Sequence, residues 1–122
     1  MDESQARECF AALSQETRLR IVRLLVMAGA DGMAAGAVAE EMGVSAANVS
    51  FHLKELERAG LIAQRREARS IIYAADYTAL GDLIGFLMKD CCGGKPEICA
   101  PVLASATCKP ASPSATRKRA HV

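Results

Sequence analysis

The sequence contains no tryptophan and few other aromatic residues, with three Phe and two Tyr among 122 residues. A hydrophobic core must therefore be built mainly from Leu, Ile, Val, Met and Ala, a mixture that favours helices. At this length we expect one folded domain with a small core. Dimerisation would allow such a domain to bury more apolar surface.

The chain also lacks an apolar run of about 20 residues, the length that a membrane-spanning helix requires. Residues 1–5 are polar and acidic, unlike the start of a secretory signal. We therefore expect a cytoplasmic protein with no membrane partner. In that reducing compartment the five cysteines are expected to be free thiols, available for ligation or redox chemistry.

A large net charge is absent as well, because the formal charge at pH 7 is only +1. Residues 100–122 carry four basic and no acidic residues, which leaves 11 basic and 14 acidic groups in residues 1–99. The overall charge of the folded part therefore does not indicate nucleic-acid binding. Affinity for DNA would have to come from a local basic patch.

Apolar periodicity predicts helices over residues 4–14, 16–28, 35–42 and 46–59. Gly43 suits the left-handed turn that ends a helix, and Ser45 is a good N-cap residue for the next one. Two helices joined by such a tight turn predict a helix-turn-helix. The inward face of its second helix is expected to carry Val49, Leu53 and Leu56.

Two short strands are predicted after Gly60, over residues 61–66 and 71–75, connected by residues 67–70 as a β-hairpin wing. The expected fold is thus mainly α with a small β-hairpin, a winged helix-turn-helix. Residues 1–92 are predicted to form the DNA-binding and dimerisation domain. Residues 93–122 are predicted to form a cysteine-containing loop and a disordered tail rich in Ala, Ser and Pro.

Residues 76–90 predict a final amphipathic helix. We expect this helix to have no partner within so small a chain, and we assign it to a homodimer interface together with the N-terminal helix. Its apolar stripe is formed by Leu80, Leu83, Ile84, Leu87 and Met88.

Polar side chains on the predicted second helix of the helix-turn-helix are candidates for contact with operator DNA. Short polar groups can reach base edges and a following cation can bind phosphate, which gives the candidates Asn48, Ser50, His52 and Lys54. The wing adds three guanidinium groups suited to phosphates or the minor groove, those of Arg65, Arg66 and Arg69. Double-stranded operator DNA is therefore the expected partner.

Cys91, Cys92 and Cys99 form a cluster directly after the final predicted helix. Adjacent Cα atoms lie about 3.8 Å apart, which is too close for an ordinary disulfide between Cys91 and Cys92. The pair is better suited to binding one soft ion or metalloid, with Cys99 arriving from a loop. Cys9 and Cys108 are weaker candidates, because Cys9 can be a small buried hydrophobe and Cys108 lies in the predicted tail.

Residues 45–62, SAANVSFHLKELERAGLI, resemble the recognition helix of the ArsR family of winged-helix metal and metalloid repressors, whose pattern is V-S-x-H-L-x-x-L-x-x-A-G-L-[VI]. Residues 13–21 resemble the family's opening L-[SA]-x-x-x-R-L-x-I. The resemblance covers roughly residues 8–90 and implies a dimeric transcriptional repressor. Members often carry Gly at the wing tip, where this chain has Ala68, and many arsenic repressors carry thiols on the helix that here spans residues 35–42 and has none.

The regulatory site is therefore expected at the cysteine cluster instead. Three thiolates suit trivalent arsenic or antimony, whereas zinc generally takes four tetrahedral ligands. We expect As(III) or Sb(III) as the inducer and no organic cofactor. The alternatives are a repressor of the same fold that senses thiol oxidation, persulfide, Cd(II) or Zn(II), and, more remotely, a thiol-rich metalloid carrier. An arsenate reductase is the least favoured alternative, because no Cys is followed by Arg at the C-x5-R spacing.

Overall fold

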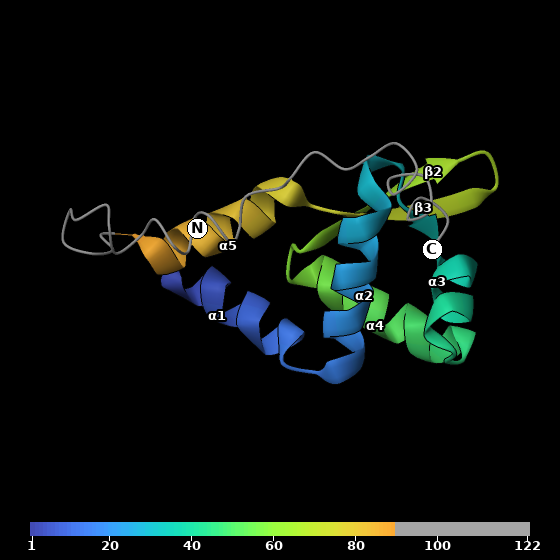
Figure 1. The fold of residues 1–122 in the computed structure, drawn as a ribbon, viewed down its shortest axis with the longest axis horizontal. Coiled ribbons are helices and arrows are strands. Elements are labelled where there is room, and N and C mark those ends of the chain that lie inside the picture. Colours follow the sequence, from blue (N-terminus) through green and yellow to red (C-terminus); the bar gives the residue numbers. More distant parts are fainter. Residues whose placement is uncertain (90–122) are drawn as a thin grey trace.

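Five α-helices and a three-stranded antiparallel sheet make up residues 1–89, the part of the chain that the computed structural model describes (Figure 1). The helices are α1 (Glu3–Leu13), α2 (Glu16–Ala28), α3 (Ala35–Met42), α4 (Ala46–Arg58) and α5 (Tyr77–Met88), with a short 3-10 helix, η1 (Gly29–Asp31), after α2. The strands are β1 (Met33–Ala34), β2 (Ile62–Glu67) and β3 (Ser70–Ala75). The predicted mainly helical winged helix-turn-helix is confirmed.

The ends of α3 and α4 follow the local signals in the sequence. Gly43 closes α3 in the left-handed conformation, with φ of 69° and ψ of 31°. Ser45 caps α4, because its hydroxyl accepts a hydrogen bond from the backbone N–H of Asn48 at 3.2 Å. Such a cap contributes about 1 kcal/mol to helix stability. The turn between the two helices is therefore specified locally.

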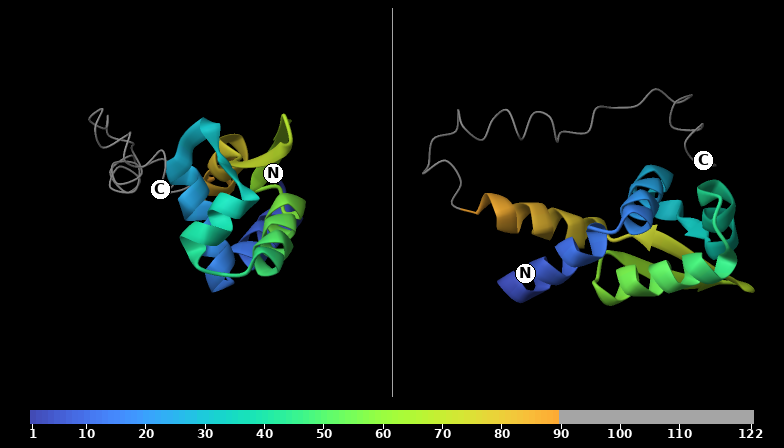
Figure 2. Two further views of the ribbon diagram at one scale, coloured as in Figure 1. Left: turned by 90° about the vertical axis from the view of Figure 1, so that its right-hand side faces the viewer. Right: turned by 90° about the horizontal axis from the view of Figure 1, so that it is seen from below.

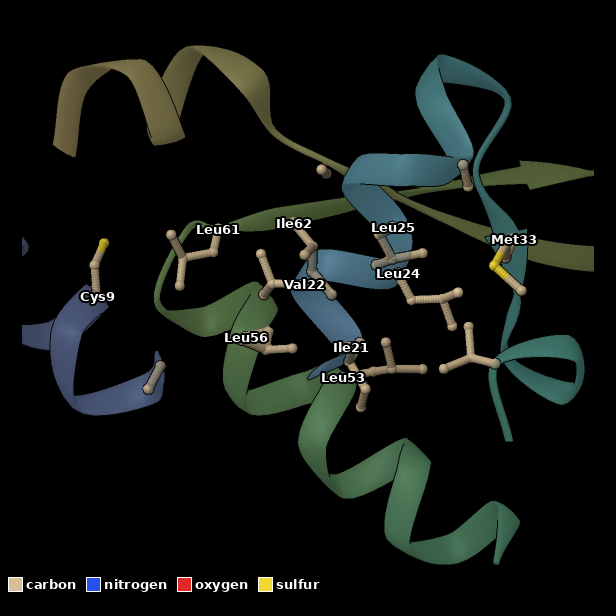
Figure 3. Close-up of a cluster of buried hydrophobic side chains, with 14 of the residues drawn as sticks. Cys9, Ile21, Val22, Leu24, Leu25, Met33, Leu53, Leu56, Leu61 and Ile62 are labelled. Atoms are coloured by element: carbon tan, nitrogen blue, oxygen red, sulfur yellow. The ribbon is translucent and has the colours of Figure 1, made fainter. Parts of the chain in front are cut away.

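The core is built around α2, which packs against α1, α3, α4 and β3. Figure 3 shows side chains of α2 pointing into a cluster with Leu53 and Leu56 of α4 and with Leu61 and Ile62, where the chain enters β2. Burying each of these aliphatic side chains contributes about 1.5–3 kcal/mol. The buried residues of α2 are Ile21, Val22, Leu24, Leu25 and Ala28.

The sheet has the order β1-β3-β2, so the predicted hairpin has an additional strand that the sequence did not indicate. β1 has only two residues, Met33 and Ala34, which pair with Tyr73 and Ile72 of β3. Gly32 precedes β1 with φ of 68°, and a Cβ atom there would overlap the backbone oxygen of Tyr73. Only glycine therefore fits where the chain turns from η1 into β1.

The wing is the antiparallel hairpin of β2 and β3, in which Glu67 is opposite Ser70 and residues 68–69 form the tip. Ala68 at the tip has a positive φ of 55°. That conformation is strained for an L-residue by roughly 1–2 kcal/mol. The turn at the wing tip therefore favours glycine at the position that Ala68 occupies.

α5 corrects one prediction about its apolar stripe. Leu83 is only 4% exposed and belongs to the core of its own chain, with Leu80 and Phe86 packed partly against that core. α5 also contacts α1, and the hydroxyl of Tyr77 donates a hydrogen bond to the carbonyl of Val26 at 2.8 Å. The expectation that this helix has no partner within the chain was therefore wrong, because its apolar residues divide between two faces.

The second apolar face of α5 is exposed, with Ile84 at 52% and Leu87 at 59%. α1 and α5 lie together at one end of the molecule, and α3 and the wing tip lie toward the other (Figures 1 and 2). No helix within residues 1–89 is both long and apolar enough to cross a bilayer.

Candidate nucleic-acid interface

α4 divides cleanly into a buried face and an exposed face. Val49, Leu53 and Leu56 are fully buried and fix the helix on the core. The predicted base-contacting residues Asn48 and Ser50, and also Lys54, are exposed. Their side chains form no hydrogen bond or ion pair within residues 1–89. These polar groups are therefore available to a ligand at the N-terminal and central part of α4.

His52 occupies a different environment, at the border between the two faces of α4. It is partly buried, and its Nδ1 lies 3.3 Å from an Nη atom of Arg18 on α2. Arg18 is itself held in place, because its Nε donates to the carbonyl of Ala12 at 2.8 Å. A guanidinium can only donate, so Nδ1 of His52 accepts and the ring proton resides on Nε2.

The charge state of His52 follows from the same contacts. Burial, followed by the positive charge of Arg18, lowers the pKa of His52 below its ordinary value of 6.5, and Glu55 opposes this shift. The imidazole is therefore neutral at pH 7. A neutral ring with its proton on Nε2 can donate one hydrogen bond, but it does not supply a cation for phosphate.

The three wing arginines also differ from one another. The guanidinium of Arg65 donates to the carbonyls of Ala30 and Asp31 at 3.1 and 2.8 Å, and its Nε donates to Glu67 at 2.8 Å. Arg66 and Arg69 are exposed and have no such partner within residues 1–89. Arg65 therefore links the wing to η1, whereas Arg66 and Arg69 remain available.

Strand alternation determines which side of the wing each arginine occupies. Nε2 of Gln64 donates to the two carboxylate oxygens of Glu57 on α4 at 2.9 and 3.1 Å. The side chain of Gln64 therefore lies on the face of β2 that is turned toward α4. Side chains two residues apart on a strand share a face, which places Arg66 on the α4 side and Arg65 on the other. The Gln64–Glu57 contact thus joins the wing to α4.

The predicted thiolate ligands Cys91, Cys92 and Cys99 lie outside the described residues, as does Cys108. Cys9 lies within them and is 1% exposed, with Sγ 3.4 Å from the carbonyl of Ala59. Burial, and next the charge of Glu8, raise the pKa of this thiol, so it stays protonated at neutral pH. Within residues 1–89 no group of three His, Cys, Asp or Glu side chains is arranged to hold a metal ion.

Two residues of this region, Arg18 and Phe51, were not predicted as functional from the sequence. Arg18 lies within the motif at residues 13–21, and its contact with His52 joins residues 34 positions apart, which no local pattern reveals. Phe51 is a large apolar residue on α4, yet it is 56% exposed. Phe51 is two residues from both Val49 and Leu53, a spacing that places it outside the buried face of the helix. The exposed position of Phe51 could therefore have been predicted from the helical periodicity of the sequence.

Comparisons with known proteins agree with this geometry. A family model described as a helix-turn-helix domain matches residues 13–65. The transcriptional repressor SdpR of Bacillus subtilis is 37% identical over 79 residues, which cover 65% of this chain and 84% of SdpR. Relatives of this kind are DNA-binding regulators of transcription, not enzymes.

Solved structures give the same assignment. An ArsR-like transcriptional regulator from Rhodococcus sp. RHA1 has a TM-score of 0.64 and 25% identity, covering 87% of this chain and 96% of that one. The homodimeric winged helix-turn-helix DNA-binding domain of Mb0332 from Mycobacterium bovis has a TM-score of 0.57 and 28% identity, covering 71% and 81%. SdpR is 37% identical over most of its length, and the ArsR-like structures share the fold of this chain. This chain therefore belongs to the ArsR-like winged helix-turn-helix transcriptional regulators.

Proposed function

We propose that this protein is a homodimeric repressor that binds operator DNA through α4 and the wing and leaves it when As(III) or Sb(III) binds Cys91, Cys92 and Cys99. The observation that carries the DNA-binding part is the set of exposed polar side chains on α4, those of Asn48, Ser50 and Lys54, which have no partner within residues 1–89. A helix fixed on the core by Val49, Leu53 and Leu56 can present these side chains rigidly to the major groove.

The DNA contacts divide by chemistry. Asn48 and Ser50 are proposed to contact base edges, and Lys54 a backbone phosphate. Arg66 and Arg69 supply the free guanidinium groups of the wing. For Arg65 the contacts with η1 favour a role in orienting the wing. His52 is proposed to donate from Nε2 to an acceptor on the DNA, in the orientation that Arg18 maintains.

The homodimer is proposed to form through the exposed faces of α5 and α1. Ile84 and Leu87 on α5 and Phe10 on α1 are large exposed apolar residues. A second copy of the chain would cover them. Two recognition helices would then contact half-sites about one helical turn of DNA apart. The homodimeric state of the similar domain of Mb0332 supports this part of the proposal.

The switch rests on thiol chemistry and on the position of the cysteines in the sequence. Cys91 follows Met88, the last residue of α5, by three positions, so a ligand at the cluster would act directly after the proposed dimer helix. A ligand shifts a conformational equilibrium only if its affinity differs between the two states. The three-sulfur site must therefore form more readily in a dimer whose recognition helices no longer match the operator spacing.

A titration on DNA tests the proposal. The purified reduced protein would be bound to the DNA upstream of its own gene and titrated with As(III), Sb(III), Cd(II), Zn(II) and peroxide in separate experiments. Release by As(III) or Sb(III) at lower concentrations than by the other reagents is the expected result. Preferential release by peroxide would favour the redox alternative, and release by Cd(II) or Zn(II) a metal sensor. A protein that does not bind any upstream DNA would overturn the repressor assignment.

A further inference from the structure

Phe51 has no evident structural reason to be on the exposed side of α4. The other large apolar residues of that helix, Val49, Leu53 and Leu56, are fully buried, whereas Phe51 is 56% exposed. At about 100° of helix rotation per residue, Phe51 lies on the side opposite to these three. An aromatic ring in that position contributes little to the core and leaves apolar surface in water.

The ring is supported from one side. Phe51 and His52 pack edge to face, with ring centroids 5.3 Å apart and an interplanar angle of 66°. His52 is in turn positioned by Arg18, whose Nη lies 3.3 Å from Nδ1. The aromatic ring thus has a neighbour that limits its orientation without covering its outward surface.

The surroundings of Phe51 identify the kind of surface that it meets. Asn48 and Lys54, three residues before and after Phe51 on the same side of α4, are polar and have no partner within residues 1–89. Ala47 is small, and Glu55, four residues after Phe51, is paired with Arg58. A protein partner would favour a broader apolar patch than one ring among polar groups. The major groove of DNA combines polar base edges with one apolar group, the C5 methyl of thymine. A ring between polar side chains matches that combination.

We infer that Phe51 contacts the C5 methyl group of a thymine in each operator half-site and so contributes to sequence specificity. This inference rests on the proposed DNA-binding function, and it adds an apolar contact to the polar contacts of Asn48 and Ser50. Burying one methyl group against the ring should strengthen binding about fourfold per site.

The test uses deoxyuridine, which differs from thymidine only by lacking this methyl group. A duplex would first be selected from a random pool by the full-length reduced protein. Each thymine of one half-site would then be replaced singly by deoxyuridine, and affinity measured for wild type and Phe51→Ala at low salt, where phosphate contacts keep a weakened variant bound. One position should show a loss of about fourfold with wild type and no loss with Phe51→Ala.

Two control variants separate this contact from general weakening. Ser50→Ala should bind the duplex less well but keep the deoxyuridine penalty at the same position. Phe51→Leu retains an apolar side chain and should keep part of the penalty. Because Phe51 is exposed, thermal unfolding of Phe51→Ala should match wild type.

The outcomes distinguish this inference from the proposed function. If wild type shows no methyl-dependent position, or if Phe51→Ala retains the full penalty at every position, the thymine contact is wrong while DNA binding stands. If the protein selects no duplex from the random pool, the DNA-binding proposal itself fails, and the thymine contact fails with it.

Discussion

α4 and α5 are both amphipathic helices of similar length, but their apolar residues are distributed differently. On α4 the residues of the apolar stripe, Val49, Leu53 and Leu56, are all buried within the chain, and the exposed side is mainly polar. On α5 only Leu83 is buried, and Ile84 and Leu87 are more than half exposed. The packing of α4 is thus complete within one chain, whereas that of α5 leaves an apolar face uncovered.

The difference indicates where each kind of partner is expected. An uncovered apolar face gains free energy when another apolar surface covers it, so α5 suits a second copy of the chain. An exposed polar face gains nothing from apolar cover and suits a polar, charged ligand such as DNA. The two faces lie on different helices, so variants can separate dimerisation from DNA contact.

The largest effect should follow from charging the exposed face of α5. Ile84→Glu combined with Leu87→Glu should give monomers with unchanged helical content, because neither side chain belongs to the core. Losing simultaneous contact with two half-sites should weaken operator binding on the order of a thousandfold. Sedimentation and DNA titration measure the two effects, with Thr78→Glu as an exposed control on the same helix. A variant that remains dimeric would show that the interface lies elsewhere.

The next effect concerns the cysteines that follow α5. Cys91→Ser, Cys92→Ser and Cys99→Ser should each keep operator binding but lose release by As(III), a response of roughly 150-fold if the coupling is about 3 kcal/mol. Cys9→Ser is the matched control and should still respond, because the thiol of Cys9 is buried and protonated. Truncation after Ala100 should also respond. A normal response by Cys99→Ser would contradict the three-thiolate site.

Much of the DNA-binding half of the fold could be predicted from the sequence, because its signals are local. Gly43, Ser45 and the spacing of Val49, Leu53 and Leu56 specify two helices and the turn between them within about 20 residues. β1 could not be predicted in this way, since two residues show no alternation. The stripe of α5 showed which residues are apolar, but periodicity does not tell whether Leu83 is covered by its own chain or by another.

The candidate site was predictable to a similar degree. Residue type and helix phase were sufficient to find Asn48, Ser50 and Lys54 on an exposed face. They were not sufficient to distinguish Arg65 from Arg66, because the two backbone carbonyls that hold Arg65 against η1 lie 34 and 35 residues away in the sequence. The contact of His52 with Arg18 has the same long-range origin. The thiolate ligands lie outside the described residues and stay a prediction.

A smaller effect should separate the wing arginines. Arg66→Ala should lower affinity several-fold for all DNA sequences and reduce the salt dependence, the slope of log K against log salt, by about 1. Arg65→Ala should leave that slope nearly unchanged and lower the thermal stability, since it removes the hydrogen bonds that join the wing to η1. DNA titrations at several salt concentrations measure the slopes. Equal slope changes for both variants would place Arg65 on the DNA as well.

The smallest effect is a pH dependence that should originate on α4, because His52 is the one histidine within residues 1–89. Burial and the charge of Arg18 lower the pKa of His52 in the folded protein, whereas the unfolded chain takes up this proton near pH 6.5. The stabilising contribution is therefore complete above about pH 6.5 and is lost as the pH falls through the lowered pKa. Urea unfolding at pH 7.5 and 5.5, at one protein concentration, should show a larger decrease in unfolding free energy for wild type than for His52→Gln, which keeps an acceptor for Arg18. The same decrease in both proteins would mean that His52 takes up its proton at its ordinary pKa and that the Arg18 contact does not hold the ring neutral.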